Sequence, residues 1–362
     1  MLKRVGVGLL VIVVLGAAYL AFWPVPVQPT VWEAPPNPGF SGLFEENDRL
    51  AAIKRLPIDG KSGPVDAATG PGGDIYVSTL QGQIMRLDAR TAAFSVFADT
   101  GGRPLGLAFG PDGTLFVADA HRGLLAVDRE GQVSVLAERD GEGKPIVNAG
   151  DVAVARDGTV YFSQASSKFG AEAQESVERA ARLDLLEHGG HGRVLRFDPA
   201  TARVETVLDG LQHVRGVALT EDGRALLVVE TGLYRVLKLP LQGGRPGAPT
   251  VLIDDLPGFP ANVNRAFDGT FWVGLDRPRP FLLDALSGYP FLRKVLLRLP
   301  EALLPAPPRY GCVLHFDQDG NILETLQDPS GAYAFTTGAA DGPEDLLVIT
   351  SSSEPAVGIL AR

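Results

Sequence analysis

The chain has 362 residues, among them 43 glycines and 28 prolines, a composition typical of short strands joined by tight turns rather than of long helices. Its formal net charge of −10, without any run of Lys or Arg, argues against nucleic acid as a partner. The one cysteine, Cys312, excludes an internal disulfide and is expected to be a buried, unreactive thiol.

The first predicted element is a membrane-anchor helix over residues 1–24. Lys3 and Arg4 precede residues 5–23, a run of 19 residues without a charged or amide side chain. As a helix, this run would be about 28 Å long, close to the thickness of a bilayer's hydrocarbon core. The flanking basic residues predict a single-pass protein with a cytoplasmic N-terminus and the rest of the chain on the extracytoplasmic (periplasmic or luminal) side. A cleavable signal peptide is the alternative, and it places the rest on the same side.

Residues 25–43 are predicted to be a Pro-rich linker. Proline cannot continue a helix and cannot donate to a sheet, so this segment should be an extended spacer between the bilayer and the folded domain. The prolines concerned are Pro26, Pro29, Pro35, Pro36 and Pro38.

Residues 44–362 are predicted to form an all-β, six-bladed β-propeller. A turn with Asp-Gly or Gly-Gly, an alternating strand, a second turn and another strand recur six times, near positions 72, 112, 157, 222, 268 and 341. A period of about 40 to 45 residues with several strands per repeat is typical of propeller blades, whose ligand sites lie at the mouth of the central channel. The two longest intervals predict insertions at about 164–190 and 276–307.

The second insertion is apolar with interspersed Arg293, Lys294 and Arg298, and Pro290 should divide it into two short helices. Basic amphipathic helices of this kind lie in membrane interfaces. We therefore expect the insertion to rest on a bilayer or to cover the channel mouth as a lid, and burial against a blade is the alternative.

Three features of the sequence could belong to a site or to ordinary structure. His188 and His191 could bind a metal or could be solvated imidazoles of a surface loop. His121 could be a general base at the channel mouth or a solvated turn residue. Glu230 could be a catalytic carboxylate or could form an ion pair with Arg235.

From about Gly63 onward the sequence resembles the strictosidine synthase-like branch of the senescence marker protein/gluconolactonase superfamily, which includes the adipocyte plasma membrane-associated proteins. The motifs that carry the resemblance are RPLGLAFGPDGTLFVADAHRGLLAVD, DVAVARDGTVYFSQASSKFG, GRVLRFDPATARVETVLDGL, VVETGLYRVLKLPL, LPGFPANV and PPRYG. They follow one another in the right order over roughly 300 residues. The resemblance implies a propeller with an N-terminal anchor and a divalent cation, usually calcium, in the channel. In hydrolytic members that cation polarises a lactone or ester carbonyl.

Carried over position by position, most of the implied metal ligands are replaced in this sequence. The family's ligand positions hold, in chain order, Val65, Gly150, Arg215 and Ala261. The acids and amides that stand beside them are Asp66, Asp151 and Asn262, and the Asp usual in the third-blade strand is Gln164. A calcium ion, if present, would have Asn262 and Asp151 as its ligands, and no other cofactor is predicted.

Arg215 is the most informative replacement because a guanidinium is always protonated in proteins. It would place a fixed positive charge near the channel axis, where a second cation would be repelled. Arg215 could therefore bind a carboxylate or another anionic ligand in place of a metal. Alternatively, it could form a structural salt bridge with Asp66 or Asp151.

The resemblance leaves three hypotheses for the function. The first is a hydrolase acting on a small lactone or ester, with Asp151, His121 and Asn262 as catalytic candidates. The second is a metal-free condensing enzyme of the strictosidine synthase type, although Thr336 and Thr337 stand where that enzyme's catalytic Glu belongs. The third is a non-catalytic, membrane-tethered propeller that binds a small apolar or anionic ligand or serves as a scaffold. The ligand-binding candidates are Arg215, Asp66 and Gln164.

Overall fold

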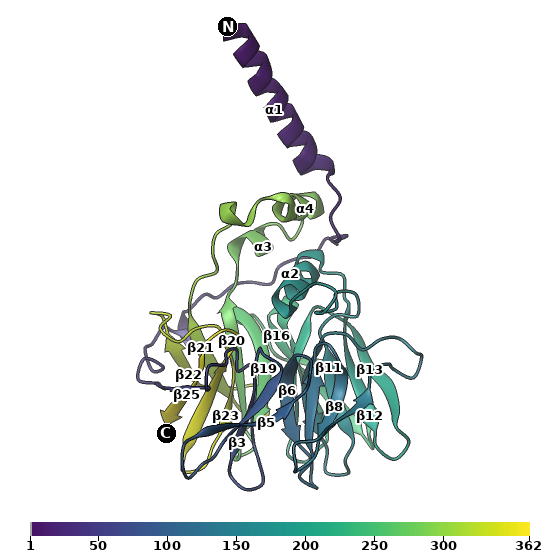
Figure 1. Cartoon of the computed structure of the whole chain (residues 1–362), viewed down its shortest axis with the longest axis vertical. Coiled ribbons are helices and arrows are strands. Elements are labelled where there is room, and N and C mark those ends of the chain that lie inside the picture. The colour runs from purple at the N-terminus through teal and green to yellow at the C-terminus, as the bar shows by residue number, and fades with distance from the viewer. Residues whose placement is uncertain (1) are drawn as a thin grey trace.

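The computed structural model describes residues 2–362, with side chains from residue 7 onward except at residue 301. Six antiparallel sheets stand around a common axis (Figure 1), which confirms the predicted six-bladed β-propeller. The innermost strands of successive blades contact one another, and contacts between β2 and β23 close the ring.

The blades follow the chain in order. Blade one contains β2 (Ala67–Thr69), β3 (Ile75–Ser78), β4 (Gln83–Leu87) and β5 (Phe94–Asp99). Blade two contains β6 (Pro104–Phe109), β7 (Leu115–Asp119), β8 (Gly123–Val127) and β9 (Val133–Ala137). Blade three contains β10 (Ala149–Val154), β11 (Val160–Gln164), β12 (Gly192–Asp198) and β13 (Arg203–Leu211). Blade four contains β14 (Val214–Leu219), β15 (Ala225–Glu230), β16 (Arg235–Gln242), β17 (Arg245–Pro246) and β18 (Thr250–Ile253). Blade five contains β19 (Gly258–Arg265), β20 (Phe271–Pro278), β21 (Gly311–Phe316) and β22 (Ile322–Asp328).

The sixth blade joins the two ends of the propeller. It contains β23 (Thr336–Asp341), β24 (Leu346–Ser351), β25 (Ala356–Ala361) and, on its outer edge, β1 (Lys54–Pro57). Because β1 pairs with β25, a strand from the start of the propeller completes a sheet formed by its end. The buried Tyr333 hydroxyl reinforces this blade by donating towards the Ile349 and Ala356 carbonyls and accepting from the Gly358 N–H. Such closure protects strand edges that would otherwise be exposed.

The recurring Asp-Gly turns form as the sequence predicts. In blade two, Gly113 has φ of +85°, a conformation that costs glycine little, and its N–H bonds to the Gly110 carbonyl. The Asp112 carboxylate accepts from the Thr114 N–H at 3.0 Å. The turn therefore reverses the chain between β6 and β7 within the five residues 110–114.

The apolar faces of neighbouring blades pack on each other and form the core. One cluster joins Val77 of blade one to Val348 of blade six, and both side chains are fully buried. Corresponding clusters join the other pairs of neighbouring blades. Cys312 belongs to one of these clusters, and its free, buried thiol confirms the prediction.

The N-terminal residues form a helix, α1 (Leu2–Phe22), that projects away from the propeller (Figure 1). Its described apolar side chains are exposed, for example Leu9 and Ile12. In the part of the chain whose side chains are described, no helix is both long and apolar enough to cross a membrane. The predicted transmembrane span is therefore not confirmed.

Residues 24–41 are extended, without helix or strand, and they pack on the folded domain. Val27 is fully buried against Phe169 and Leu183. The Thr30 N–H donates to the Glu187 carbonyl at 2.9 Å. The segment is thus fastened to the domain along its length and is not a free spacer.

Two insertions form a helical cap at one end of the propeller (Figure 1). Residues 165–191 contain α2 (Val177–Glu187), and residues 279–310 contain α3 (Phe281–Ala285), α4 (Pro290–Arg298) and the 3₁₀ turn η3 (Glu301–Leu303). Two further 3₁₀ turns are η1 (Gly42–Phe44) and η2 (Thr231–Leu233). We use the name helical cap for α2, α3 and α4 together. In Figure 1, α2 and α3 lie next to the propeller, and α4 lies beyond them, towards α1.

Candidate functional site

The buried carboxyl groups at the start of the innermost strands hold neighbouring blades together. Asp66, just before β2, accepts from the Leu107 N–H of blade two at 2.8 Å. Its own N–H donates to the Ser78 hydroxyl, which in turn donates to the Leu105 carbonyl at 3.0 Å. Two side chains of blade one thus bind the backbone of the first strand of blade two, Asp66 as an acceptor and Ser78 as a donor.

Asp151 repeats this arrangement between blades three and four. Its carboxylate accepts from the Val217 N–H at 3.0 Å, and its own N–H donates to the Ser163 hydroxyl, which donates to the Arg215 carbonyl. The second carboxylate oxygen accepts from the Val152 N–H at 2.8 Å. Asp66 and Asp151 therefore occupy equivalent positions, and both already use their oxygens on the protein itself.

Burial changes the acidity of both groups. Removal from water raises the pKa of Asp66 to about 6, against a smaller lowering by hydrogen bonds from Asn264 and Leu107. Burial, and then the neighbouring charge of Asp66, raise the pKa of Asp151 well above its usual range. Two buried carboxyl groups close to each other cannot both carry a charge cheaply, so the protein interior favours a proton on this pair.

Two amides lie beside these acids, the buried Asn262 and the half-buried Asn264. The Asn264 amide donates to the Asp66 carboxylate at 2.9 Å, and the Asn262 amide N–H points at the Val65 carbonyl at 3.4 Å. The Oδ1 atoms of Asn262 and Asn264 are buried without a hydrogen-bond partner among the described atoms. They are the oxygen atoms of this region that the protein leaves unused.

Arg215, at the start of β14, is the cation that the sequence predicts near the axis. Burial lowers the pKa of its guanidinium, and the charges of Asp276, Glu178 and Asp151 oppose that effect. Its side chain makes no hydrogen bond or ion pair with any of the residues described here. The predicted salt bridge to Asp66 or Asp151 is therefore not formed.

Arg103 is a second guanidinium at this end of the channel, and sequence reasoning missed it. It is 4% exposed; its Nη1 donates to the Pro104 carbonyl at 3.0 Å, and its buried Nε has no partner among the described atoms. Burial lowers its pKa to about 10; the charge of Glu178 opposes that effect, whereas Arg215 adds to it. Arg103 is the first residue of the blade motif RPLGLAF, and the mostly apolar residues of that motif indicate a strand and not a binding site.

The insertion in blade three covers this end of the channel. Ala171 and Val177 pack on Val65 and Leu105, so the segment leading into α2 lies on the residues beside Arg103 and Asp66. The sequence assigned a possible lid to the other insertion, in blade five. The structure instead places the 165–191 insertion on the mouth, with α4 in contact with α2.

The residues present do not fit calcium, which takes six to eight oxygen ligands. Val65 and Ala261 offer no side-chain oxygen. A Cβ added to Gly150 would lie 2.9 Å from the Ser163 hydroxyl that connects blades three and four, so an amide cannot occupy that position without displacing it. The Arg215 charge adds repulsion. Within the described residues, moreover, no group of three or more His, Cys, Asp or Glu side chains could hold a metal.

The other predicted ligand and base residues lie outside this arrangement. Gln164 is buried in blade three, where its Oε1 accepts from the Arg193 Nε at 2.7 Å. His121 is exposed on the turn between β7 and β8, where its backbone N–H donates to Asp119. Glu230 forms the ion pair with Arg235 at 2.7 Å, which confirms the structural interpretation.

Of the two imidazoles near α2, His188 is buried, contrary to the expectation for a surface loop, and His191 is partly exposed. His188 stacks on the Trp32 ring at 4.0 Å and is 4% exposed. Burial, and then the Arg293 charge, lower its pKa to about 3. The His191 ring bonds to Glu187 at 2.7 Å. The packing of residues 24–41 over the insertion, which is not visible in the sequence, accounts for the burial of His188 under Trp32.

Thr336 and Thr337 are hydrogen-bonded within the channel wall. The Thr336 hydroxyl donates to the Leu275 carbonyl at 3.1 Å, and the Thr337 hydroxyl donates to the Val65 carbonyl at 2.6 Å. Both side chains are fully buried. The wall offers no carboxylate at this position for a condensation of the strictosidine synthase type.

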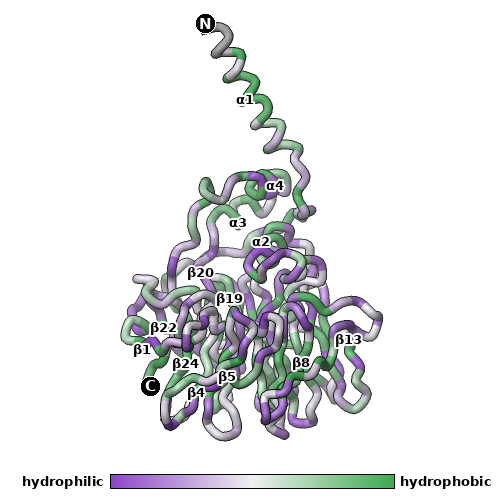
Figure 2. The backbone as a smooth tube through the Cα atoms, in the orientation of Figure 1, coloured by the Kyte–Doolittle hydropathy of each residue, from purple (hydrophilic) through white to green (hydrophobic). Residues whose placement is uncertain are grey.

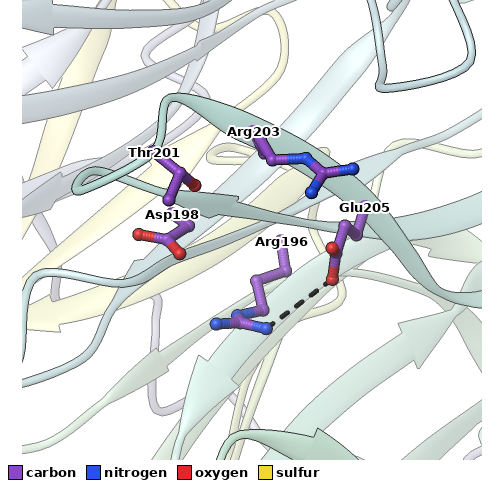
Figure 3. A pocket seen from close by; sticks show the side chains of 5 residues that line it. All are labelled: Arg196, Asp198, Thr201, Arg203 and Glu205. Carbon is purple, nitrogen blue, oxygen red and sulfur yellow. Dashed lines mark ion pairs between the residues drawn. The ribbon is translucent and has the colours of Figure 1, made fainter.

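Two hollows on the outside of the blades are poor candidates for a ligand. One, of about 110 Å³, lies on the outer strands of blade three (Figure 3) and is lined by Arg196, Asp198, Thr201, Arg203 and Glu205. The other is lined by Arg156, Glu221, Asp222 and Gln318. Both linings are charged and lack the apolar walls that small-molecule sites use.

Comparison with known proteins supports the family resemblance. The model for strictosidine synthase matches residues 150–243, and that for the strictosidine synthase-like N-terminal region matches residues 42–87. An adipocyte plasma membrane-associated protein from Bos taurus is 32% identical over 343 residues, which are 89% of this chain and 81% of that protein. Strictosidine synthase-like 13 from Arabidopsis thaliana is 37% identical over 237 residues, 64% of this chain and 57% of that protein.

Among solved structures, a gluconolactonase from Xanthomonas campestris superposes with a TM-score of 0.63 at 19% identity, covering 93% of this chain and 98% of that one. This likeness shows the shared fold. The matched segments and the identity over most of both chains show more: the chain belongs to the strictosidine synthase-like family, in the branch of the adipocyte plasma membrane-associated proteins.

Proposed function

We propose that this protein binds a small organic carboxylate at the capped mouth of its channel, without a metal ion. The observation that carries the proposal is the half-buried Arg215 guanidinium, for which the described residues provide no hydrogen-bonding or ion-pairing partner. A buried charge without a partner is costly, and a carboxylate matches the planar fork of a guanidinium. The ligand would supply the acceptors that the protein lacks.

The surroundings of Arg215 suggest the character of the ligand. The buried Arg103 adds positive charge, and Val65, Leu105, Ala171 and Val177 form an apolar cluster beside it. We therefore expect a carboxylate carried on an apolar body. Because Ala171 and Val177 cover the mouth, the ligand would enter when this segment opens.

Hydrolysis of lactones or esters is less well supported by the geometry. The oxygens of Asp66 and Asp151 accept backbone and amide hydrogens, so neither is free to attack a carbonyl. Their raised pKa values favour a proton, which a general acid would need. Turnover of esters or lactones of the bound acids would show that the ligand site also performs chemistry.

We also propose that α1 attaches the protein to a membrane and that the propeller lies on the extracytoplasmic side. The exposed apolar side chains of α1 support this, as does the basic pair Lys3 and Arg4 ahead of them in the sequence. The name of the bovine relative, adipocyte plasma membrane-associated protein, is consistent with it.

Replacing Arg215 by Met is expected to weaken carboxylate binding by about 10- to 100-fold, the worth of one or more charged hydrogen bonds. Isothermal titration of the purified chain with short aliphatic and aromatic carboxylates measures this. Arg224→Met is the matched control, because the Arg224 side chain is 85% exposed and 3.9 Å from Asp222. Equal affinity in Arg215→Met and the wild type, or no binding by the wild type, would refute the proposed site.

A further inference from the structure

The outer surface of the helical cap exposes a cluster of large apolar side chains. Phe281 is 80% exposed, Tyr289 60% and Phe291 54%. With Leu282, Leu292 and Leu303 they make up what we call the apolar platform. Figure 2 shows hydrophobic segments along α3 and α4 at the same end of the molecule as α1. Soluble proteins rarely gather such side chains on one surface unless that surface binds something.

The platform is fastened to the root of α1. The Arg298 side chain of α4 donates from Nε to the Trp23 carbonyl and from Nη1 to the Leu20 carbonyl, both at 2.7 Å. These carbonyls lie at the C-terminal end of α1, where a helix attracts a cation. Whatever medium surrounds the end of α1 therefore also meets the platform.

The blade-five insertion, with α3 and α4, does not carry the basic face that the sequence predicts for it. Arg293 is fully buried and Arg298 is 7% exposed, and both are used on backbone carbonyls. Lys294 is half-buried, and the chain as a whole has a formal net charge of −10. Attraction to anionic headgroups is thus a weak source of binding, and apolar contact is the strong one.

We propose that the apolar platform lies in the interface of the same bilayer that holds α1 and inserts its aromatic side chains among the lipids, independently of lipid charge. This inference rests on the proposed attachment through α1. Phe and Tyr side chains on a short helix are well suited to the boundary between headgroups and acyl chains. A bilayer is favoured over a second copy of the chain because the described residues of α1, 7–22, are apolar and mostly exposed, and the proposed attachment places them in lipid beside the platform.

One consequence concerns the ligand site. Since α2 lies between the propeller and α4 (Figure 1), the capped mouth of the channel would face the membrane surface. A carboxylate with an apolar body would then reach Arg215 from the interface and not from bulk water.

The test places a fluorescent label at the platform and at a matched distant position. Phe291→Cys and Phe267→Cys are labelled with an environment-sensitive dye in the full chain, reconstituted into nanodiscs of zwitterionic or anionic lipid. Phe267 is a suitable control because it is 69% exposed, on the turn between β19 and β20. Cys312 is 1% exposed, so it does not compete for the label.

With brominated acyl chains, emission at position 291 should fall at least about twofold, while emission at position 267 stays unchanged. The fall should be the same in both lipids and at high salt. If the chain remains in the disc but the label at position 291 is not quenched, the inference is wrong. It is also wrong if self-association of the chain shields that label from the brominated lipid. A chain that does not enter the discs at all instead refutes the attachment through α1.

Discussion

Replacing Arg293 by Met is expected to destabilise the helical cap by about 3 to 5 kcal/mol, since hydrogen bonds to charged groups are worth about 1.5 to 3 kcal/mol each. The buried guanidinium donates to the Leu186 carbonyl at 2.9 Å, to the Ser287 carbonyl at 3.2 Å and to the Thr30 carbonyl. These carbonyls come from α2, from the residues after α3, and from the N-terminal segment. Met fills similar space but removes the guanidinium donor from all three carbonyls, of which Ser287 keeps the Trp32 N–H at 3.3 Å.

The effect of this substitution should be measured in the helical cap and in residues 24–33, because the hydrogen bonds of Arg293 lie there and not in the blades. Amide exchange in residues 24–33 should accelerate by about 100- to 4,000-fold, since local opening sets exchange rates and each 1.4 kcal/mol is a factor of ten. The Trp32 ring, stacked on His188, should change its fluorescence. Lys294→Met on the same helix is the control and should leave both signals unaltered. Wild-type exchange in Arg293→Met would show that the cap is held together by its apolar contacts alone.

Replacing Asp66 by Asn is expected to change how stability depends on pH. In the folded protein the pKa of Asp66 is raised from 3.8 to about 6, so between these values the folded state holds a proton that the unfolded chain has released. The contribution of Asp66 to the free energy of unfolding of the wild type is therefore fully present below about pH 4. It is lost as the pH rises to about 6. Asn does not titrate, so the variant should gain about 2 to 3 kcal/mol relative to the wild type across this window.

Denaturant unfolding of both proteins between pH 4 and pH 7 measures the difference. Its slope matters more than its absolute value, because Asn also gives up one of the two acceptors that serve Leu107 and Asn264. Asp88→Asn is the control of opposite sign: N–H groups of Thr91 and Arg90 lower the pKa of this exposed carboxyl. A difference between Asp66→Asn and wild type that does not vary with pH would mean that Asp66 is ionised throughout the range.

The propeller could be predicted from the sequence because its determinants are local. Each blade can be recognised by a turn such as that at Gly113 and by strands of alternating polarity. Six such units in a row indicate a propeller whose first and last blades meet. The fastening of residues 24–41 to the cap could not be predicted, because it depends on long-range contacts such as Thr30 with Glu187. The burial of His188 under Trp32 was missed for the same reason.

The sequence could indicate which residues stand at the site, but not which hydrogen bonds they make between blades. From the family resemblance, the sequence predicts that Val65, Gly150, Arg215 and Ala261 stand where relatives have metal ligands. That the oxygens of Asp66 and Asp151 are used to join blades depends on strand register between neighbouring sheets, which no local pattern reveals. The insertion that covers the channel mouth also depends on three-dimensional packing. Amphipathicity indicated the insertion in blade five, whereas the 165–191 insertion lies there.

The central claim is that the channel binds a carboxylate and not calcium. It is tested most directly by the melting temperature of the full chain in detergent, measured with excess calcium, with a chelator, and with a saturating small carboxylate. A ligand that binds only the native state raises the melting temperature. The account predicts a rise with the carboxylate that disappears in Arg215→Met, and no response to calcium or chelator. A rise with calcium that the chelator reverses would contradict it.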